Sequence, residues 1–351
     1  MASIAASLSL AWSDLRFRAR RFAVAGLASS VVLALLLQMT GVVNQLHREP
    51  REAVDRFGGS HWIVPTDVDG AFTSNATFPE SLVEGAEGGR VLLARYRLAD
   101  DQGNNDLDAI LIGHEDLPDG APELSDGRLA DNAGEVVLAD AADFSVGDEV
   151  QVGTTPATVV GIVDDASVFA GMPLVFVPLE TARALVVGGE PLISALVVDD
   201  VPDLPAELQA LEASAVADDA LGPVERPVTT LRLVQILLAV VATLIIGAVV
   251  FLATLDRLRD IAVMRAMGVR SSVISLGVVV QSVGVGAVAG VFAVIIQLFL
   301  APVFPLDIHL GTTDRLLLVG VAIVVAAAAS YGAIRRTLRI DPSQAFAGPG
   351  G

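Results

Sequence analysis

The sequence predicts an α-helical membrane protein with four transmembrane helices and an α+β extracytoplasmic domain inserted between helices 1 and 2. Three observations support this fold class: 53% of the residues are hydrophobic, 41 acidic residues stand against 22 basic ones, and the apolar and acidic residues are segregated along the chain. Such segregation is typical of a protein that combines membrane spans with a soluble domain.

Four apolar stretches are long enough to cross the hydrocarbon core of a bilayer, since about 30 Å of hydrocarbon takes about 20 helical residues. They are Phe22–Val43, Leu233–Leu255, Val273–Leu300 and Leu316–Ile334. A cleaved signal peptide is the alternative for the first stretch, but its apolar run exceeds the usual length of about 7–15 residues. We therefore interpret it as an uncleaved span.

The distribution of Arg predicts the orientation, because Arg near the ends of spans is enriched on the cytoplasmic side. Eleven Arg lie before span 1, between spans 2 and 3, and after span 4, whereas the loop between spans 3 and 4 has only Arg315. Both termini are thus expected in the cytoplasm. The predicted segments are 1–21 (cytosolic amphipathic helix), 22–46 (helix 1), 47–230 (extracytoplasmic domain), 231–255 (helix 2), 256–272 (cytosolic coupling segment), 273–300 (helix 3), 301–315 (outer loop), 316–334 (helix 4) and 335–351 (cytosolic tail).

The segment from His47 to Thr230 has the charge and patterning of a soluble α+β domain. It contains 35 acidic residues and 9 Arg, a formal charge of −26, which keeps a domain soluble and disfavours nucleic acid as a partner. Strands are predicted at 91–98, 107–113, 134–140, 148–153 and in three later apolar runs. Helices are predicted at 181–189 and at 204–217, the latter with Leu208 and Leu211 on one face. The turn formers Gly222, Pro223 and Pro227 are expected to mark the end of the domain.

The composition excludes several kinds of chemistry. The chain has no Cys, so it has no disulfide, thiolate metal site or Cys nucleophile, and no Lys, so it has no P-loop and no Schiff base. Its four His are scattered without the spacing of a metalloprotease helix. We therefore expect no catalytic residue, no bound metal and no cofactor in this chain, and any ATP must be bound by another one.

Polar residues in span 1 are the first candidate site, because polar groups that face lipid cost free energy. The residues are Gln38, Met39, Thr40, Asn44 and Gln45. Hydrogen bonding to neighbouring helices explains them without a further function. Alternatively they line a substrate path, with Met39 as a soft contact or a haem ligand. In span 3, Gly286 and Gly290 form a small-xxx-small face on which another helix can pack.

The Arg-rich segment after span 2 is the second candidate site. Its helical pattern is expected to stop at Gly268, and Ile261, Met264 and Met267 recur along it at every third residue. Its four Arg are explained by membrane anchoring alone. The apolar residues, however, have no cytosolic domain of this chain to pack on, so they predict a surface for a partner protein.

These residues resemble the signature of the FtsX-like permease family. The segment LDRLRDIAVMRAMGVRSSVI is similar to the family pattern at Arg257, Asp260, Ile261, Ala262, Met264, Arg265, Ala266, Met267 and Gly268, and LRIDPSQAF to its closing motif at Asp341, Pro342 and Ala345. The stretch from GEVVLADAADF to PLVFVPLETARAL resembles the MacB-type extracytoplasmic core. The opening of the outer segment resembles the DevC and HrtB-like branch.

The resemblance implies the permease subunit of an ABC transporter in the plasma membrane of a bacterium. It implies a homodimer in contact with lipid and bound to two copies of a separate P-loop ATPase, which would hold ATP and Mg and press on residues 257–268. The function implied first is export of a hydrophobic or amphipathic compound such as haem, a lipid or a drug, with haem as substrate only. The alternative is mechanotransmission that regulates an extracytoplasmic cell-wall hydrolase.

Overall fold

The structure is a computed structural model that describes residues 19–100, 106–118, 122–255, 263, 267, 271–301 and 310–337. The chain divides into two compact units. The helical unit comprises the residues up to Val43 and from Thr230 onward, and the sheet unit comprises Asn44–Thr229. Two helices, α2 and α4, have residues in both units.

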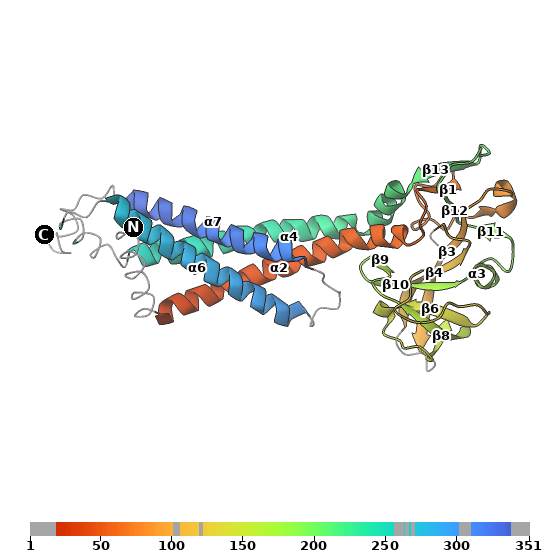
Figure 1. The fold of residues 1–351 in the computed structure, drawn as a ribbon, viewed down its shortest axis with the longest axis horizontal. Helices are drawn as coiled ribbons and strands as arrows, with labels where there is room; N and C mark the ends of the chain where they lie inside the picture. Colours follow the sequence, from red (N-terminus) through yellow and green to blue (C-terminus); the bar gives the residue numbers. More distant parts are fainter. Residues whose placement is uncertain are drawn as a thin grey trace. The chain divides into compact units, whose positions relative to one another are not determined.

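Four of the described helices are long and apolar enough to cross a membrane: α2 (Ala19–Asp55), α4 (Ala213–Leu255), α6 (Ser271–Leu300) and α7 (Thr312–Thr337), all labelled in Figure 1. At about 1.5 Å per residue, the 37 residues of α2 extend about 55 Å. This is longer than the hydrocarbon core, so α2 continues beyond its predicted apolar run and into the sheet unit. Likewise, α7 begins before Leu316.

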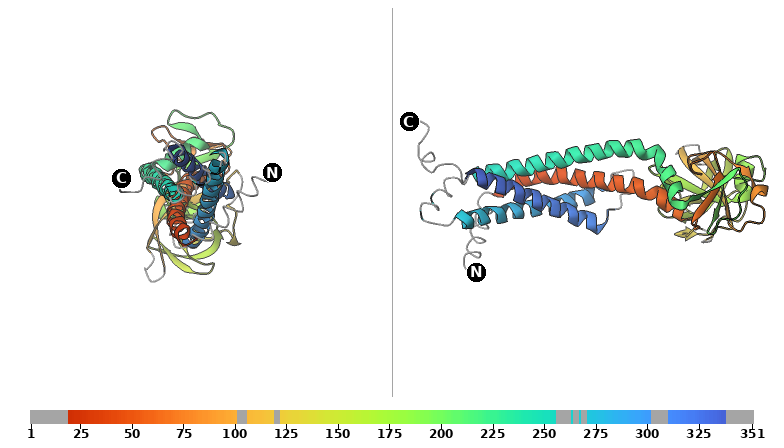
Figure 2. Two further views of the ribbon diagram at one scale, coloured as in Figure 1. Left: turned by 90° about the vertical axis from the view of Figure 1, so that its left-hand side faces the viewer. Right: turned by 90° about the horizontal axis from the view of Figure 1, so that it is seen from above.

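The helical unit has a small core that is rich in alanine. Residues from all four helices meet in it: Leu33, Ala34, Leu37, Ala242, Ile246, Ala289, Ala293, Leu318, Ala322 and Ala326. Helices α6 and α7 lie side by side (Figure 2). Large apolar side chains of α4 point outward instead, for example Leu233 and Leu244, which are 68% and 66% exposed. Such a surface suits a lipid environment, in which small residues mediate helix packing.

The sheet unit contains one mixed sheet of eleven strands within the described residues. The elements are β1 (His61–Pro65), β2 (Phe78–Pro79), η1 (Glu80–Val83), β3 (Gly89–Asp100), β4 (Leu107–Glu115), β5 (Asp126–Gly127), β6 (Glu135–Ala139), η2 (Asp140–Ala142), β7 (Glu149–Val152), β8 (Thr155–Val163), β9 (Ser167–Val168), β10 (Met172–Pro178), α3 (Leu179–Val186), β11 (Leu192–Ile193), β12 (Ala195–Val198) and β13 (Leu208–Glu212). The strand order is β13-β1-β12-β3-β4-β10-β6-β8-β5, β7 pairs with β3 and β8, and β9 pairs with β10. The pairs β10–β4 and β6–β8 are parallel.

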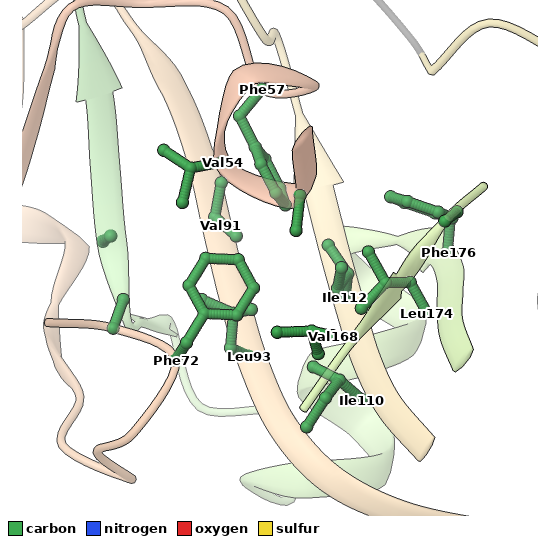
Figure 3. Close-up of a cluster of buried hydrophobic side chains, with 14 of the residues drawn as sticks. Val54, Phe57, Phe72, Val91, Leu93, Ile110, Ile112, Val168, Leu174 and Phe176 are labelled. Atoms are coloured by element: carbon green, nitrogen blue, oxygen red, sulfur yellow. The ribbon is translucent and has the colours of Figure 1, made fainter. Parts of the chain in front are cut away.

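The two faces of the sheet carry separate cores, as the alternation of strand side chains requires. On β3, Leu92 packs in the core that α3 covers, whereas Val91 and Leu93 pack in the opposite core. The end of α2 contributes Val54 to this second core (Figure 3), and the start of α4 contributes Val216, Ala217 and Ala220. There Phe57, in the turn that follows α2, meets Trp62 edge to face, with 5.0 Å between the ring centroids. Both membrane-directed helices are therefore built into the core of the sheet unit.

The combination of four long apolar helices with an α+β domain is confirmed, and each strand predicted from the sequence is present. The helix predicted at 204–217 is wrong before Ala213, where α4 begins, because Leu208–Glu212 form strand β13, which pairs with β1 over five residues. Leu208 and Leu211 consequently lie in different cores instead of on one helix face. Pairing with a strand about 145 residues away has overridden the local helical pattern.

Gly222, Pro223 and Pro227 do not form the break expected before span 2, because α4 runs through all three residues from Ala213, although the sheet unit itself ends at Thr229. Proline removes a backbone donor and disfavours helix interiors. Here the neighbouring side chains of Val224 and Val228 are buried, with 7% and 4% of their surface exposed. Their packing offsets the lost hydrogen bonds.

Candidate functional site in the membrane helices

Two of the polar residues predicted in span 1, Gln38 and Thr40, make hydrogen bonds to other helices of the helical unit. Gln38 of α2 and Gln297 of α6 are fully buried, at 0% and 1% exposure, and Nε2 of Gln297 donates to Oε1 of Gln38 at 3.5 Å. The other two polar atoms, Nε2 of Gln38 and Oε1 of Gln297, have no hydrogen-bond partner among the described residues. The pair thus connects α2 to α6 through one long hydrogen bond and leaves two buried polar atoms unsatisfied.

A second polar contact connects α2 to α4. Nε2 of Gln235 donates to Oγ1 of Thr40 at 2.8 Å, and the same hydroxyl donates to the carbonyl oxygen of Leu36 at 2.8 Å. The Thr40 hydroxyl is therefore satisfied both as donor and as acceptor. Within one and a half turns of α2, one amide faces α6 and one hydroxyl faces α4.

An open groove of about 280 Å³ lies between α2, α4 and α7. Its lining residues are Leu36, Leu37, Thr40, Gln235, Ile236, Ala239, Asp314, Leu317, Leu318 and Val321. Apolar side chains make up most of the wall, and the polar part consists of the Thr40–Gln235 pair and the Asp314 carboxylate. A volume close to the lower end of the range for small-molecule pockets, about 300 Å³, suits one apolar moiety with a polar group beside it.

Asp314 is placed at the groove by the start of α7. It lies in the first turn of the helix, and its Oδ2 accepts the backbone N–H of Gly311 at 3.3 Å. A carboxylate in the first turn is favoured by the positive end of the helix dipole. The groove also lies close in sequence to the points where α2 leaves the helical unit, at Val43, and α4 enters it, at Thr230.

Of the residues predicted as a substrate path, Thr40 lines the groove and the other four do not. Gln38 faces α6, and Met39 is half-buried and absent from the groove lining. Asn44 and Gln45 belong to the sheet unit, where Gln45 is 5% exposed. Among the described residues, no group of three His, Asp or Glu side chains is arranged to hold a metal ion.

The prediction missed Gln235, Gln297 and Asp314. A usable signal was present, because Gln235 and Gln297 are amides within predicted apolar spans, the same observation that singled out Gln38. Asp314 gave no such signal, since the sequence placed it in the loop before helix 4.

The glycines predicted for helix packing face α7. A Cβ atom on Gly286 would lie 2.8 Å from the carbonyl oxygen of Ala322, and one on Gly290 would lie 3.1 Å from Cα of Val319. The absence of side chains at these two positions is what allows α6 and α7 to approach.

Of the predicted coupling segment, 256–272, the structure describes Val263, Met267 and the first two residues of α6, Ser271 and Ser272. Val263 and Met267 lie within the part that was expected to bind the ATPase. Their side chains are 49% and 70% exposed, and the N–H of Met267 donates to the carbonyl oxygen of Val263 at 3.0 Å, the spacing of a helical turn. The remaining predicted residues lie outside the described part of the chain: Arg257, Asp260, Ile261, Met264, Arg265, Ala266, Gly268, Asp341 and Pro342.

Comparison with known proteins gives matches over most of the chain. Residues 232–342 match the FtsX-like permease C-terminal family, and residues 23–213 match the MacB-like periplasmic core domain. An uncharacterized ABC transporter permease of Mycobacterium tuberculosis is 33% identical over 97% of this chain and 100% of its own length. The macrolide export ATP-binding/permease protein MacB 2 of Aeromonas hydrophila is 21% identical over 92% of this chain and 57% of its own length. The crystal structure of the periplasmic region of MacB from Actinobacillus actinomycetemcomitans aligns with a TM-score of 0.31 and 16% identity, over 47% of this chain and 94% of that structure.

Proposed function

Because this chain belongs to the FtsX-like ABC transporter permeases with a MacB-like periplasmic core domain, we propose that it couples ATP hydrolysis by a separate ATPase to the extrusion of a hydrophobic or amphipathic compound. It would act as a homodimer in the plasma membrane of a bacterium, with both termini in the cytoplasm and the sheet unit outside. Family membership confirms the resemblance that the sequence signature gave.

The need for a separate ATPase is supported by the composition. A P-loop requires a Lys that contacts the phosphates of the nucleotide, and this chain has no Lys. The Aeromonas relative is named an ATP-binding/permease protein, and this chain aligns with 57% of it. In the proposed complex, ATP and Mg are therefore held by the partner ATPase.

The class of cargo is supported by the groove between α2, α4 and α7, which is the observation that carries the proposal. Its wall is apolar except at Thr40, Gln235 and Asp314. An apolar moiety would fill the space between the leucines, and a polar head group would hydrogen-bond to the hydroxyl, amide or carboxylate. A purely hydrophilic solute would leave most of this wall without favourable contacts.

Cargo-stimulated ATP hydrolysis by the permease reconstituted with its ATPase in lipid vesicles tests the proposal, with haem, lipids and hydrophobic drugs as probes. Ile236→Trp would fill the groove and should lower the stimulation. Leu233→Trp is the matched control, because Leu233 lies one turn away on α4, is exposed and does not line the groove. Stimulation by none of the probes, or equal stimulation in both variants, would contradict the assignment.

Coupling to the ATPase is supported by the two exposed apolar side chains of the coupling segment. Val263 and Met267 are a helical turn apart, so they form part of one apolar edge. Replacing Met264 and Met267 with Asp would place charges in the partner's apolar groove and should uncouple hydrolysis from transport without unfolding the permease. Met267→Leu is the control that keeps the edge apolar. Normal co-purification and transport in the double Asp variant would refute this role.

The proposed orientation is testable directly because the chain has no Cys. Ser214 in the sheet unit and Met267 in the coupling segment are both exposed. A membrane-impermeant maleimide added to intact spheroplasts should label a Ser214→Cys variant and not a Met267→Cys variant. Labelling of the Met267→Cys variant but not of the Ser214→Cys variant would show that the topology is the opposite of the proposed one.

A further inference from the structure

Within the sheet unit, α2 and α4 each carry a carboxylate that is held by a turn of that unit. On α2, Glu49 is 2% exposed, and its Oε2 accepts the backbone N–H of Ala170 at 3.0 Å and that of Gly171 at 3.2 Å. On α4, the two carboxylate oxygens of Asp219 lie 2.7 and 2.6 Å from Oγ1 of Thr73, which donates to them. Both contacts join residues more than 100 positions apart in the sequence.

The turn that binds Glu49 has an unusual backbone. Phe169, Ala170 and Gly171 have φ values of 54°, 71° and 92°, so three successive residues are left-handed. Each of the two non-glycine residues costs about 1–2 kcal/mol in this conformation. It points two N–H groups toward one carboxylate, as in an anion-binding nest. On the other side of the turn, the Arg95 guanidinium lies 5.3 Å from the ring centroid of Phe169.

The site on α4 is shaped by Gly70. A Cβ atom at Gly70 would lie 2.2 Å from Oδ2 of Asp219, so any side chain there would displace the carboxylate. Val216, Ala217 and Ala220, close to Asp219 on α4, pack in the core that also contains Val54 of α2. Each helix is therefore attached by apolar packing and by one oriented carboxylate.

Burying these two carboxylates costs free energy, so stability alone does not explain their presence. Burial raises the pKa of Glu49 and of Asp219, against the hydrogen bonds from Ala170, Gly171 and Thr73 that lower it. An apolar side chain would fill either position without that desolvation cost. The carboxylates add a directional contact. Their hydrogen bonds fix the position of the helix along its axis and its rotation about that axis, whereas apolar contacts allow the helix to slide.

We propose that Glu49 and Asp219 are positioning residues that transmit movement of α2 and α4 to the 169–171 turn and to the segment around Thr73. This inference rests on the proposed function, in which the ATPase moves these helices. A continuous helix transmits an axial shift along its length, and the hydrogen bonds to Glu49 weaken steeply once they lengthen by a few tenths of an ångström beyond about 3.2 Å. When α2 shifts, the 169–171 turn must therefore move with it, or the hydrogen bonds to Glu49 must break.

The test uses the full-length permease with its ATPase in lipid nanodiscs. A spin label on a Val201→Cys variant, at an exposed position of the sheet unit, reports the distance between the two copies with and without ATP. Glu49→Ala should lose most of the ATP-driven distance change and several-fold of the cargo transported per ATP. Glu52→Ala is the matched control, since Glu52 lies one turn along α2 and pairs with Arg48 at a solvent-exposed site.

Two further variants separate positioning from folding. Glu49→Gln keeps one acceptor oxygen and should restore part of the transport per ATP. In a Glu49→Cys and Ala170→Cys double variant, which otherwise has no Cys, closing a short bis-maleimide link should restore transport that the unlinked form lacks. Full distance change in folded Glu49→Ala, or transport blocked by the link, would overturn the proposal. If the unsubstituted chain shows neither a distance change nor cargo-stimulated hydrolysis, the proposed function fails instead.

Discussion

Gly286 lies where α6 packs against the backbone of α7, and we predict that Gly286→Ala separates the two helices. The new Cβ atom would lie 2.8 Å from the carbonyl oxygen of Ala322 and 2.8 Å from Cβ of Ala326. Non-bonded carbon atoms reach their best contact at about 3.5–4.0 Å. Since one of the two obstacles is backbone, α7 itself must move, by about 0.7–1.2 Å if it alone adjusts.

The size of the effect follows from a comparison with Gly284→Ala on the same helix. A Cβ atom on Gly284 would meet no atom of another described element within 4 Å, so alanine there faces open space. Both substitutions gain the same helix propensity, up to about 1 kcal/mol, and this gain cancels in the comparison. What remains is the overpacking cost at Gly286, about 1–3 kcal/mol.

The difference can be measured by equilibrium unfolding in mixed micelles of dodecyl maltoside and dodecyl sulfate, followed by the helical circular dichroism signal. Gly286→Ala should unfold at a lower fraction of dodecyl sulfate than the unsubstituted chain, and Gly284→Ala at an equal or higher one. Equal stability of the two variants would refute the assignment of Gly286 to the α6–α7 contact.

Three further predictions concern the sheet unit. Arg128 and backbone N–H groups lower the pKa of Glu135 to about 2. The ionised Glu135 carboxylate therefore stabilises the fold above pH 4.5, and this stabilisation is lost as the pH falls toward 2. The difference in Tm between Glu135→Gln and the unsubstituted chain should vanish over that range. Burial raises the pKa of Glu49, so the stability of the unsubstituted chain relative to Glu49→Gln should fall as the pH rises through that pKa, measured as Tm against pH. Arg183→Met removes a buried guanidinium paired with Glu80 at 2.7 Å and should cost about 1–3 kcal/mol in denaturant unfolding, since Glu80 keeps Arg90.

The sequence was sufficient for those elements whose pattern is local. An apolar run of about 20 residues can only be satisfied as a buried or membrane-spanning helix, and the short continuous apolar runs in β3 and β4 are typical of strands with two covered faces. Leu208–Glu212 could not be assigned in this way, because their partner strand begins at His61 and their local pattern also suits a helix. The prolines of α4 led to a wrongly predicted break for a related reason. The burial of Val224 and Val228, which stabilises the helix there, depends on the tertiary structure and cannot be predicted from the neighbouring sequence.

For the candidate site, the sequence identified which groups needed partners but not which partners they have. Gln38 stood out as an amide in an apolar run, yet its partner Gln297 lies 259 residues away. Gln235, the partner of Thr40, is 195 residues away. The groove exists only because three helices meet there, and no single helix encodes it. The apolar edge predicted at Ile261, Met264 and Met267 stays a prediction, because the structure describes only Met267 of the three.

The polar residues of α2 share one buried face along its length. Gln38, Gln45 and Glu49 are separated by seven and four residues, close to whole numbers of helical turns, and all three are at most 5% exposed. They change from amides within the apolar run to a carboxylate beyond it, as the cost of burying charge in hydrocarbon requires. Gln38 binds α6 in the helical unit, and Glu49 binds the 169–171 turn in the sheet unit. A rotation of α2 by one residue, about 100°, would break both contacts at once. The contacts of Gln38 and Glu49 therefore each fix the rotation of α2 about its axis, one within the helical unit and one within the sheet unit.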